Sequence, residues 1–245
     1  MSESESGLKL PKYSPIPEGE DPSNFAEYRS TKYRFPKRPL FHLPPSIGEI
    51  TGPLLGEDRV GPHDHDLTAH GHGEPLGERI IVHGRLLDSG GRPIPGQLIE
   101  IWQANACGRY IHKVDQHPAP LDPNFTGVGR TVTDAEGRYR FITIKPGAYP
   151  WGNHHNAWRP QHIHFSITGR ALPQRLVTQM YFPGDPLFVQ DPIFNAVRDE
   201  KARNRMISRL DLEETVPEWA LAYQWDIVLR GPDETPNIET AEEHG

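Results

Sequence analysis

The chain has 245 residues, of which 26 are proline and 23 are glycine, and only 35% of its residues are hydrophobic. So many chain-breaking residues exclude a helical bundle, whereas an aromatic content of 9% excludes a fully disordered chain. A formal net charge of −7 argues against nucleic acid or an anionic membrane surface as the main partner.

The cellular compartment is indicated by a single cysteine, Cys107, which cannot form an intramolecular disulfide and suits a reducing environment. No stretch of the chain reaches the roughly 18 apolar residues of a membrane span. The sequence MSESESGLKL at the start is acidic and serine-rich, without the pattern of a secretory signal. We therefore expect a cytoplasmic protein.

Residues 1–77 contain eleven prolines and are expected to form an extended arm. One short helix is predicted from Pro22 to Lys32, with Asp21 as its N-cap and proline in its first turn. An arm of this composition cannot bury a core of its own. We expect it to wrap the following domain or to reach a partner subunit.

From residue 78 the pattern changes to short β-rich runs separated by turn residues. A helix is predicted over residues 197–210, and residues 233–245 are expected to form a solvated acidic tail. Residues 78–232 are therefore predicted to fold as one all-β domain, a β-sandwich with long loops. Its strands are expected at residues 79–87, 97–103, 129–133, 138–144, 162–168, 175–182 and 221–230.

The sharpest local signal is the pair His162 and His164 on a predicted strand. Side chains alternate between the two faces of a strand, so both imidazoles project from one face. Ile163, Phe165 and Ile167 would then occupy the opposite face. This arrangement offers two ligands to a metal ion, although two unrelated histidines would give the same pattern.

Further ligands would have to come from upstream, because the run FSITGRALPQRL that includes and follows Phe165 contains no Asp, Glu or His. Tyr110 and Tyr149 each lie just beyond a predicted strand and are the candidates. Two phenolates and two imidazoles favour Fe(III), which prefers anionic oxygen donors. Zinc would more readily recruit cysteine or carboxylate ligands.

Two other features are assigned no chemistry. The run His63-Asp64-His65-Asp66 resembles a metal cluster, but it lies in a Pro- and Gly-rich loop without strand spacing. Cys107 is expected to be a small buried residue near Tyr110, since no motif activates it as a nucleophile.

Four motifs carry a family resemblance: EIWQANACGRY, GRYRFITIKPGAYPW, WRPQHIHF and TQMYFPGDP. They resemble, in order, the iron-carrying β chains of the intradiol ring-cleavage dioxygenases that act on protocatechuate. The resemblance extends from about Tyr28 to Arg230 and implies a prealbumin-like β-sandwich. It also implies non-haem Fe(III) with a solvent-derived hydroxide, axial ligands Tyr149 and His164, and equatorial ligands Tyr110 and His162.

The implied reaction is the cleavage of 3,4-dihydroxybenzoate by O2 to 3-carboxy-cis,cis-muconate, with Tyr149 also acting as an internal base. Arg159 would stabilise negative charge on the ring, or alternatively form a structural ion pair with Asp185 or Asp191. The resemblance further implies a homologous α subunit in an αβ protomer. It places Gln179 next to the ligands and assigns the substrate pocket to Tyr28, Arg34, Trp151 and Ile193.

Two alternatives remain open at this point. The first is a catechol or hydroxyquinol intradiol dioxygenase, whose helical N-terminal domain is not matched by the proline-rich arm. The second is a non-enzymatic prealbumin-like module, which the run IIVHGRLLDSGGRPIPGQLIEIW resembles locally. That module would leave the two tyrosines and two histidines unexplained. The α subunit is excluded because it is expected to lack this ligand set.

Overall fold

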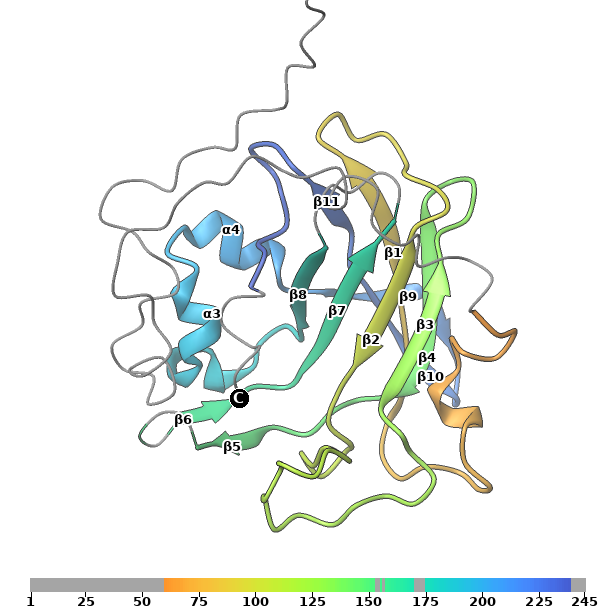
Figure 1. Ribbon diagram of the computed structural model, residues 1–245, viewed down its shortest axis with the longest axis vertical. Coiled ribbons are helices and arrows are strands. Elements are labelled where there is room, and N and C mark those ends of the chain that lie inside the picture. Colours follow the sequence, from red (N-terminus) through yellow and green to blue (C-terminus); the bar gives the residue numbers. More distant parts are fainter. Residues whose placement is uncertain (1–59, 153–154, 156, 170–174, 239–245) are drawn as a thin grey trace, which may run out of the picture.

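The computed structural model describes residues 60–152, 155, 157–169 and 175–238. Within this part the chain forms two main β-sheets and a short hairpin (Figure 1). One sheet has the order β11 (Ile227–Leu229), β1 (Arg79–Asp88), β10 (Ala220–Gln224), β9 (Arg209–Val216), and β4 (Arg138–Ile144) also pairs with β1. The other has the order β3 (Val128–Val132), β2 (Leu98–Trp102), β7 (His162–Thr168), β8 (Leu176–Tyr181).

A single apolar core joins the two sheets. Alternate residues of β1, such as Ile80 and Val82, pack in one cluster with Ile163, Phe165 and Ile167 of β7. The alternation follows from the pleat of a strand, which sends every second side chain to the same face. Two sheets that share one core form a β-sandwich, so the predicted fold class is confirmed.

Small elements gather beside the four-stranded sheet. The hairpin of β5 (Tyr149–Trp151) and β6 (Ala157–Arg159) lies at the end of the sandwich where β7 begins, and α3 and α4 lie near β8 (Figure 1). Among the described residues, the helices are η2 (Leu67–Ala69), η3 (Pro186–Gln190), α3 (Pro192–Ala196) and α4 (Glu200–Arg205).

The strand predicted over residues 221–230 is in fact two strands, β10 and β11, which pair in parallel with successive parts of β1. The strand is interrupted at Trp225 and Asp226. The Asp226 side chain accepts a hydrogen bond from Arg85 N at 2.9 Å, taking the place of a backbone acceptor. Gly84 allows this close approach, because a Cβ there would lie 1.8 Å from the Trp225 carbonyl oxygen.

The helix predicted over residues 197–210 is also wrong in its extent. Asp199 caps α4 through Lys201 N at 2.9 Å, and the helix ends at Arg205. Beyond it, Ser208 N donates to the Tyr181 carbonyl oxygen, and the chain continues as strand β9 beside β10. Pairing with existing strands therefore overrides the helical propensity of this segment.

Two smaller expectations differ from the structure, and a third falls outside the described residues. Cys107 is exposed rather than buried, because it lies in a tight turn in which Gly108 N donates to the Asn105 carbonyl oxygen. Thr235 and Ile238, expected in a solvated tail, are buried, and Ile238 N donates to Val177 O. The helix predicted from Pro22 to Lys32, and with it Tyr28 and Arg34, lies outside the described residues.

The described end of the predicted arm packs on the sandwich. Leu67 is fully buried in the core cluster, and Ile142 N of β4 donates to the His65 carbonyl oxygen. Among the residues that the structure describes, no helix is long and apolar enough to cross a membrane.

Candidate metal site

The four predicted ligands meet at one end of the sandwich. Strand β2 ends there and β7 begins there, since Trp102 of β2 pairs with His164 of β7. Tyr110 lies in the loop that follows β2, and Tyr149 is the first residue of β5. Elements far apart in the sequence thus bring two phenols to the two imidazoles of β7.

The phenols and imidazoles form two close pairs. The Tyr110 hydroxyl lies 2.9 Å from Nε2 of His164, and the Tyr149 hydroxyl lies 3.4 Å from Nε2 of His162. The ring centroids of the two histidines are 4.9 Å apart, and those of the two tyrosines are 5.4 Å apart. Both histidines are buried, at 2% and 6% exposure. Four donor groups therefore converge on one small volume.

The ring of His162 is oriented by its other nitrogen. Nδ1 lies 2.6 Å from the Pro160 carbonyl oxygen, which can only accept, so Nδ1 carries the proton. The Nε2 lone pair is then directed toward Tyr149. Burial, followed by the positive charge of Arg159 and the neighbouring His164, holds the pKa of His162 well below its usual value. The imidazole is therefore neutral near pH 7 and able to bind a metal ion.

Asn105 joins the two segments that carry the tyrosines. Its side-chain oxygen accepts from Cys107 N at 2.9 Å and Arg109 N at 3.0 Å, which shapes the loop leading to Tyr110. Its carbonyl oxygen accepts from Gly147 N at 2.9 Å, next to the segment leading to Tyr149. The two backbones touch at Gly108, where a Cβ would lie 2.3 Å from the Ala148 carbonyl oxygen.

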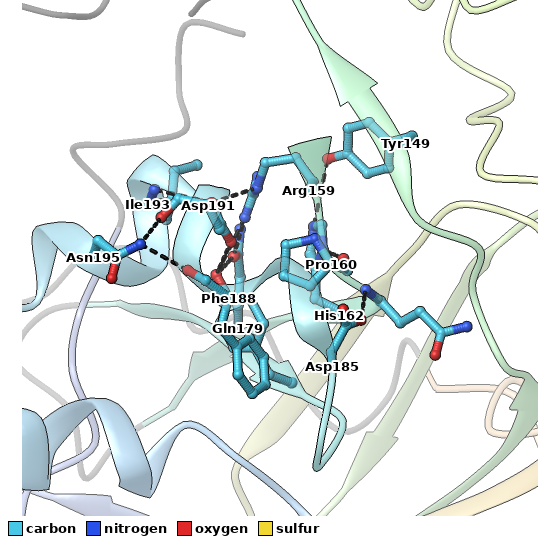
Figure 2. Close-up of polar contacts among 12 residues, drawn as sticks. Tyr149, Arg159, Pro160, His162, Gln179, Asp185, Phe188, Asp191, Ile193 and Asn195 are labelled. Carbon is cyan, nitrogen blue, oxygen red and sulfur yellow. Dashed lines mark hydrogen bonds and ion pairs between the residues drawn. The ribbon is translucent and has the colours of Figure 1, made fainter. Parts of the chain in front are cut away.

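Arg159 lies near Tyr149 and His162 in a buried polar network (Figure 2). Its side chain is 2% exposed, and Nε lies 2.9 Å from Oδ1 of Asp191. The terminal NH2 group donates to Oε1 of Gln179 at 2.5 Å and to the Tyr181 hydroxyl at 3.2 Å. Gln179 Nε2 in turn lies 3.4 Å from Nδ1 of His164. The alternative of an ion pair with Asp191 is therefore present in the structure, whereas Asp185 instead accepts from Gln161 N.

Two of the predicted pocket residues share a cluster at this end. Ile193 is buried, and Trp151 packs against the same cluster, which also contains Tyr181. The Trp151 ring centroid lies 5.8 Å from the Arg159 guanidinium carbon.

Sequence reasoning missed two side chains that contact the candidate ligands. Trp102 stacks on His164 with ring centroids 4.8 Å apart, and Tyr181 lies beside His162 at 5.7 Å. Strand alternation could have indicated Tyr181, because it lies two residues beyond Gln179 on the same strand. Trp102 becomes a neighbour only through the pairing of β2 with β7.

The run from His63 to Asp66 does not gather into a further site. In the described ranges, no three His, Cys, Asp or Glu side chains form a group that could hold a metal ion. Asp66 instead caps η2 by accepting from Thr68 N, and Asp64 lies 3.4 Å from Nε of Arg130.

Comparison with known proteins agrees with this fold. A protein-family model described as "Dioxygenase" matches residues 50–231, and the chain belongs to the intradiol dioxygenase family. A protocatechuate 3,4-dioxygenase beta chain from Burkholderia cepacia is 61% identical over 212 residues, covering 86% of this chain and 90% of the relative. A protocatechuate 3,4-dioxygenase alpha chain from the same organism is 27% identical, covering 65% of this chain and 76% of that one.

A solved structure supports the fold alone. The 3-chlorocatechol 1,2-dioxygenase from Rhodococcus opacus 1CP superposes with a TM-score of 0.52 at 21% sequence identity. The match covers 69% of this chain and 65% of that chain.

Proposed function

We propose that this chain is the iron-carrying β subunit of a protocatechuate 3,4-dioxygenase, which cleaves 3,4-dihydroxybenzoate with O2 to 3-carboxy-cis,cis-muconate. The observation that carries the proposal is the convergence of Tyr110, Tyr149, His162 and His164 at one end of the sandwich. The 61% identity to a β chain with this name supports the choice of substrate.

The donor set fits a single Fe(III) ion. Two donors bound at about 2.0–2.1 Å and separated by about 90–120° lie about 2.8–3.6 Å apart. The two phenol–imidazole pairs, at 2.9 and 3.4 Å, fall in this range. Phenolate oxygen and neutral imidazole are suitable ligands for Fe(III). Cys107 is exposed, and among the described residues no three His, Cys, Asp or Glu side chains form a group that could hold a metal ion.

When bound, Fe(III) would act as a Lewis acid on the two oxygens of the diol and make the ring reactive toward O2. The residues of the chain have separate tasks. His162 and His164 would offer their Nε2 lone pairs from a buried strand, with the proton of each neutral ring on Nδ1. In its phenolate form, Tyr149 would accept a proton of the incoming diol at its phenolic oxygen. It lies on a short hairpin at the margin of the sandwich.

Arg159 would stabilise the negative charge that develops on the ring. Its guanidinium keeps its charge at any working pH, and its burial strengthens its electrostatic effect. Trp151 and Ile193 would form an apolar wall for the ring of the substrate. The partner would be a homologous α chain, and the similarity of this chain to two protocatechuate 3,4-dioxygenase alpha chains, at 27% and 28% identity, supports this choice.

The test is to measure O2 uptake and the visible spectrum of the iron-loaded αβ complex with protocatechuate and then with catechol. We expect a coloured protein, a spectral change on adding protocatechuate, and faster turnover of protocatechuate than of catechol. Faster turnover of catechol or hydroxyquinol would favour the alternative substrate class. A colourless, fully active zinc protein would contradict the proposed site.

A further inference from the structure

Asp191 contacts three separate parts of the candidate site although it is not one of the predicted ligands. Its Oδ1 atom pairs with Arg159 Nε at 2.9 Å and accepts from Ile193 N at 3.0 Å. Its Oδ2 atom lies 2.9 Å from the Tyr181 hydroxyl. Figure 2 shows the carboxylate between Arg159 and the start of α3. One side chain thus links the guanidinium, the pocket wall and strand β8.

Helix capping alone does not account for this placement. Asp199 caps α4 in the same way, through Lys201 N at 2.9 Å, and does so while exposed. Asp191 is fully buried, and burying a carboxylate costs several kcal/mol unless a charged partner compensates. A buried carboxylate paired with a buried arginine therefore has a role beyond the helix end.

The geometry indicates what the carboxylate does for Arg159. The ion pair between Arg159 Nε and Asp191 leaves the NH2 end of the guanidinium directed at Gln179 Oε1, 2.5 Å away. The Gln179 side chain in turn lies beside His164, with Nε2 at 3.4 Å from Nδ1. Without the carboxylate, a long arginine side chain has other rotamers available, and the positive charge would no longer be held in one place.

We propose that Asp191 is a positioning residue, which holds the Arg159 charge at the reacting ring and couples it to the pocket wall at Ile193. This inference rests on the proposed function. Asp191 acts through Arg159 and does not contact the substrate or the metal ion.

The experiment compares Asp191→Asn with Asp199→Asn in the iron-loaded αβ complex. Both changes remove one charge at an N-cap and keep a capping oxygen. We expect kcat with protocatechuate to fall about 10- to 100-fold for Asp191→Asn, the scale of a small misplacement of a catalytic group, and to stay within about twofold for Asp199→Asn. Iron content and the visible band without substrate should match the wild type in both. Equal kcat in the two iron-loaded variants would overturn the inference.

A double mutant separates positioning from simple stability. If Asp191 acts through Arg159, Asp191→Asn should lower kcat no further in an Arg159→Ser background, whereas independent effects would multiply. The melting temperatures of the metal-free variants measure any loss of stability separately from turnover. If Asp191→Asn does not fold, Asp191→Glu keeps the charge but moves it by one methylene, and wild-type kcat in that variant would also overturn the inference. Absence of diol-dependent O2 uptake by the wild type would instead refute the proposed function.

Discussion

The two candidate tyrosine ligands differ in how closely they approach their histidines. Tyr110 is 2.9 Å from His164, and Tyr149 is 3.4 Å from His162. Tyr149→Phe and Tyr110→Phe should each shift or weaken the broad visible band of the iron-loaded protein, because one phenolate is lost. Stopped-flow mixing should also show slower diol binding for Tyr149→Phe, which lacks the internal base. Tyr139→Phe is the control, since Tyr139 is buried in the core, and a band equally altered in that variant would contradict the assignment.

The buried ion pair gives Arg159 both a structural and a chemical effect. Arg159→Ser leaves Asp191 as an unpaired buried carboxylate, so a stability loss of about 3–5 kcal/mol is expected. The kcat of the remaining folded enzyme should fall by about 10²–10³. Arg159→Lys keeps the charge but lacks the planar fork, so it should melt closer to the wild type and still turn over slowly. Normal kcat in a folded, iron-loaded Arg159→Lys protein would exclude the chemical role.

The residue pattern was sufficient for some members of this site and insufficient for others. The shared face of His162 and His164 follows from strand alternation alone, and the structure has both buried at one end of β7. The partner of Arg159 could not be chosen between Asp185 and Asp191, because each precedes a proline and caps a short helix. Only the packing of α3 against β8 distinguishes the two aspartates.

At the scale of elements, the contact between the Tyr110 loop and the segment before Tyr149 can be tested at Gly108. This residue has a φ of +76°, and an added Cβ would lie 2.3 Å from Ala148 O. Gly108→Ala should lower the melting temperature and weaken the visible band on iron titration, because the two tyrosines are forced apart. Gly91→Ala is a matched control, with a φ of +75° and nothing within 4 Å of the added Cβ. That variant should lose only the backbone term of about 1–2 kcal/mol and keep the band. Equal bands in the two variants would contradict the prediction.

The elements that the sequence did not predict are short or depend on partners. Strands β5 and β6 have three residues each, too few for an alternating pattern to be seen. Strand β9 carries Leu210 and Leu212 on exposed positions, so its apolar residues do not indicate a buried face. By contrast, residues 138–144 and 162–168 were predicted with their observed bounds, because both strands supply alternate residues to the core.

At the scale of the whole molecule, we expect the chain to require a homologous α chain. Co-expression of the two should give a hetero-oligomer by size-exclusion chromatography and light scattering, with higher solubility than the β chain alone. The basis is the proline-rich arm of residues 1–77 together with the similarity to β and α chains of one enzyme. A β chain that is monomeric, monodisperse and as active as the complex would show that no partner is needed.

The sandwich should also fold without iron, because its core contains none of the four candidate ligands. Protein stripped of metal by a chelator is expected to keep its β-sheet circular dichroism spectrum and to melt cooperatively. Adding Fe(III) should then restore the visible band without a refolding step. Loss of the sheet spectrum on chelation would contradict this expectation.

The register of β7 has a consequence for errors in folding. A shift of one residue would move Ile163, Phe165 and Ile167 out of the core, at a cost of about 1.5–3 kcal/mol for each side chain. The same shift would turn His162 and His164 toward the interior and separate them from both tyrosines. Because one register satisfies both faces, we expect a chain that pairs β7 wrongly to be less stable and not to accumulate as a folded but inactive form. The hydrophobic core thus selects the register that brings both histidines to the tyrosines, and this selection requires no metal ion.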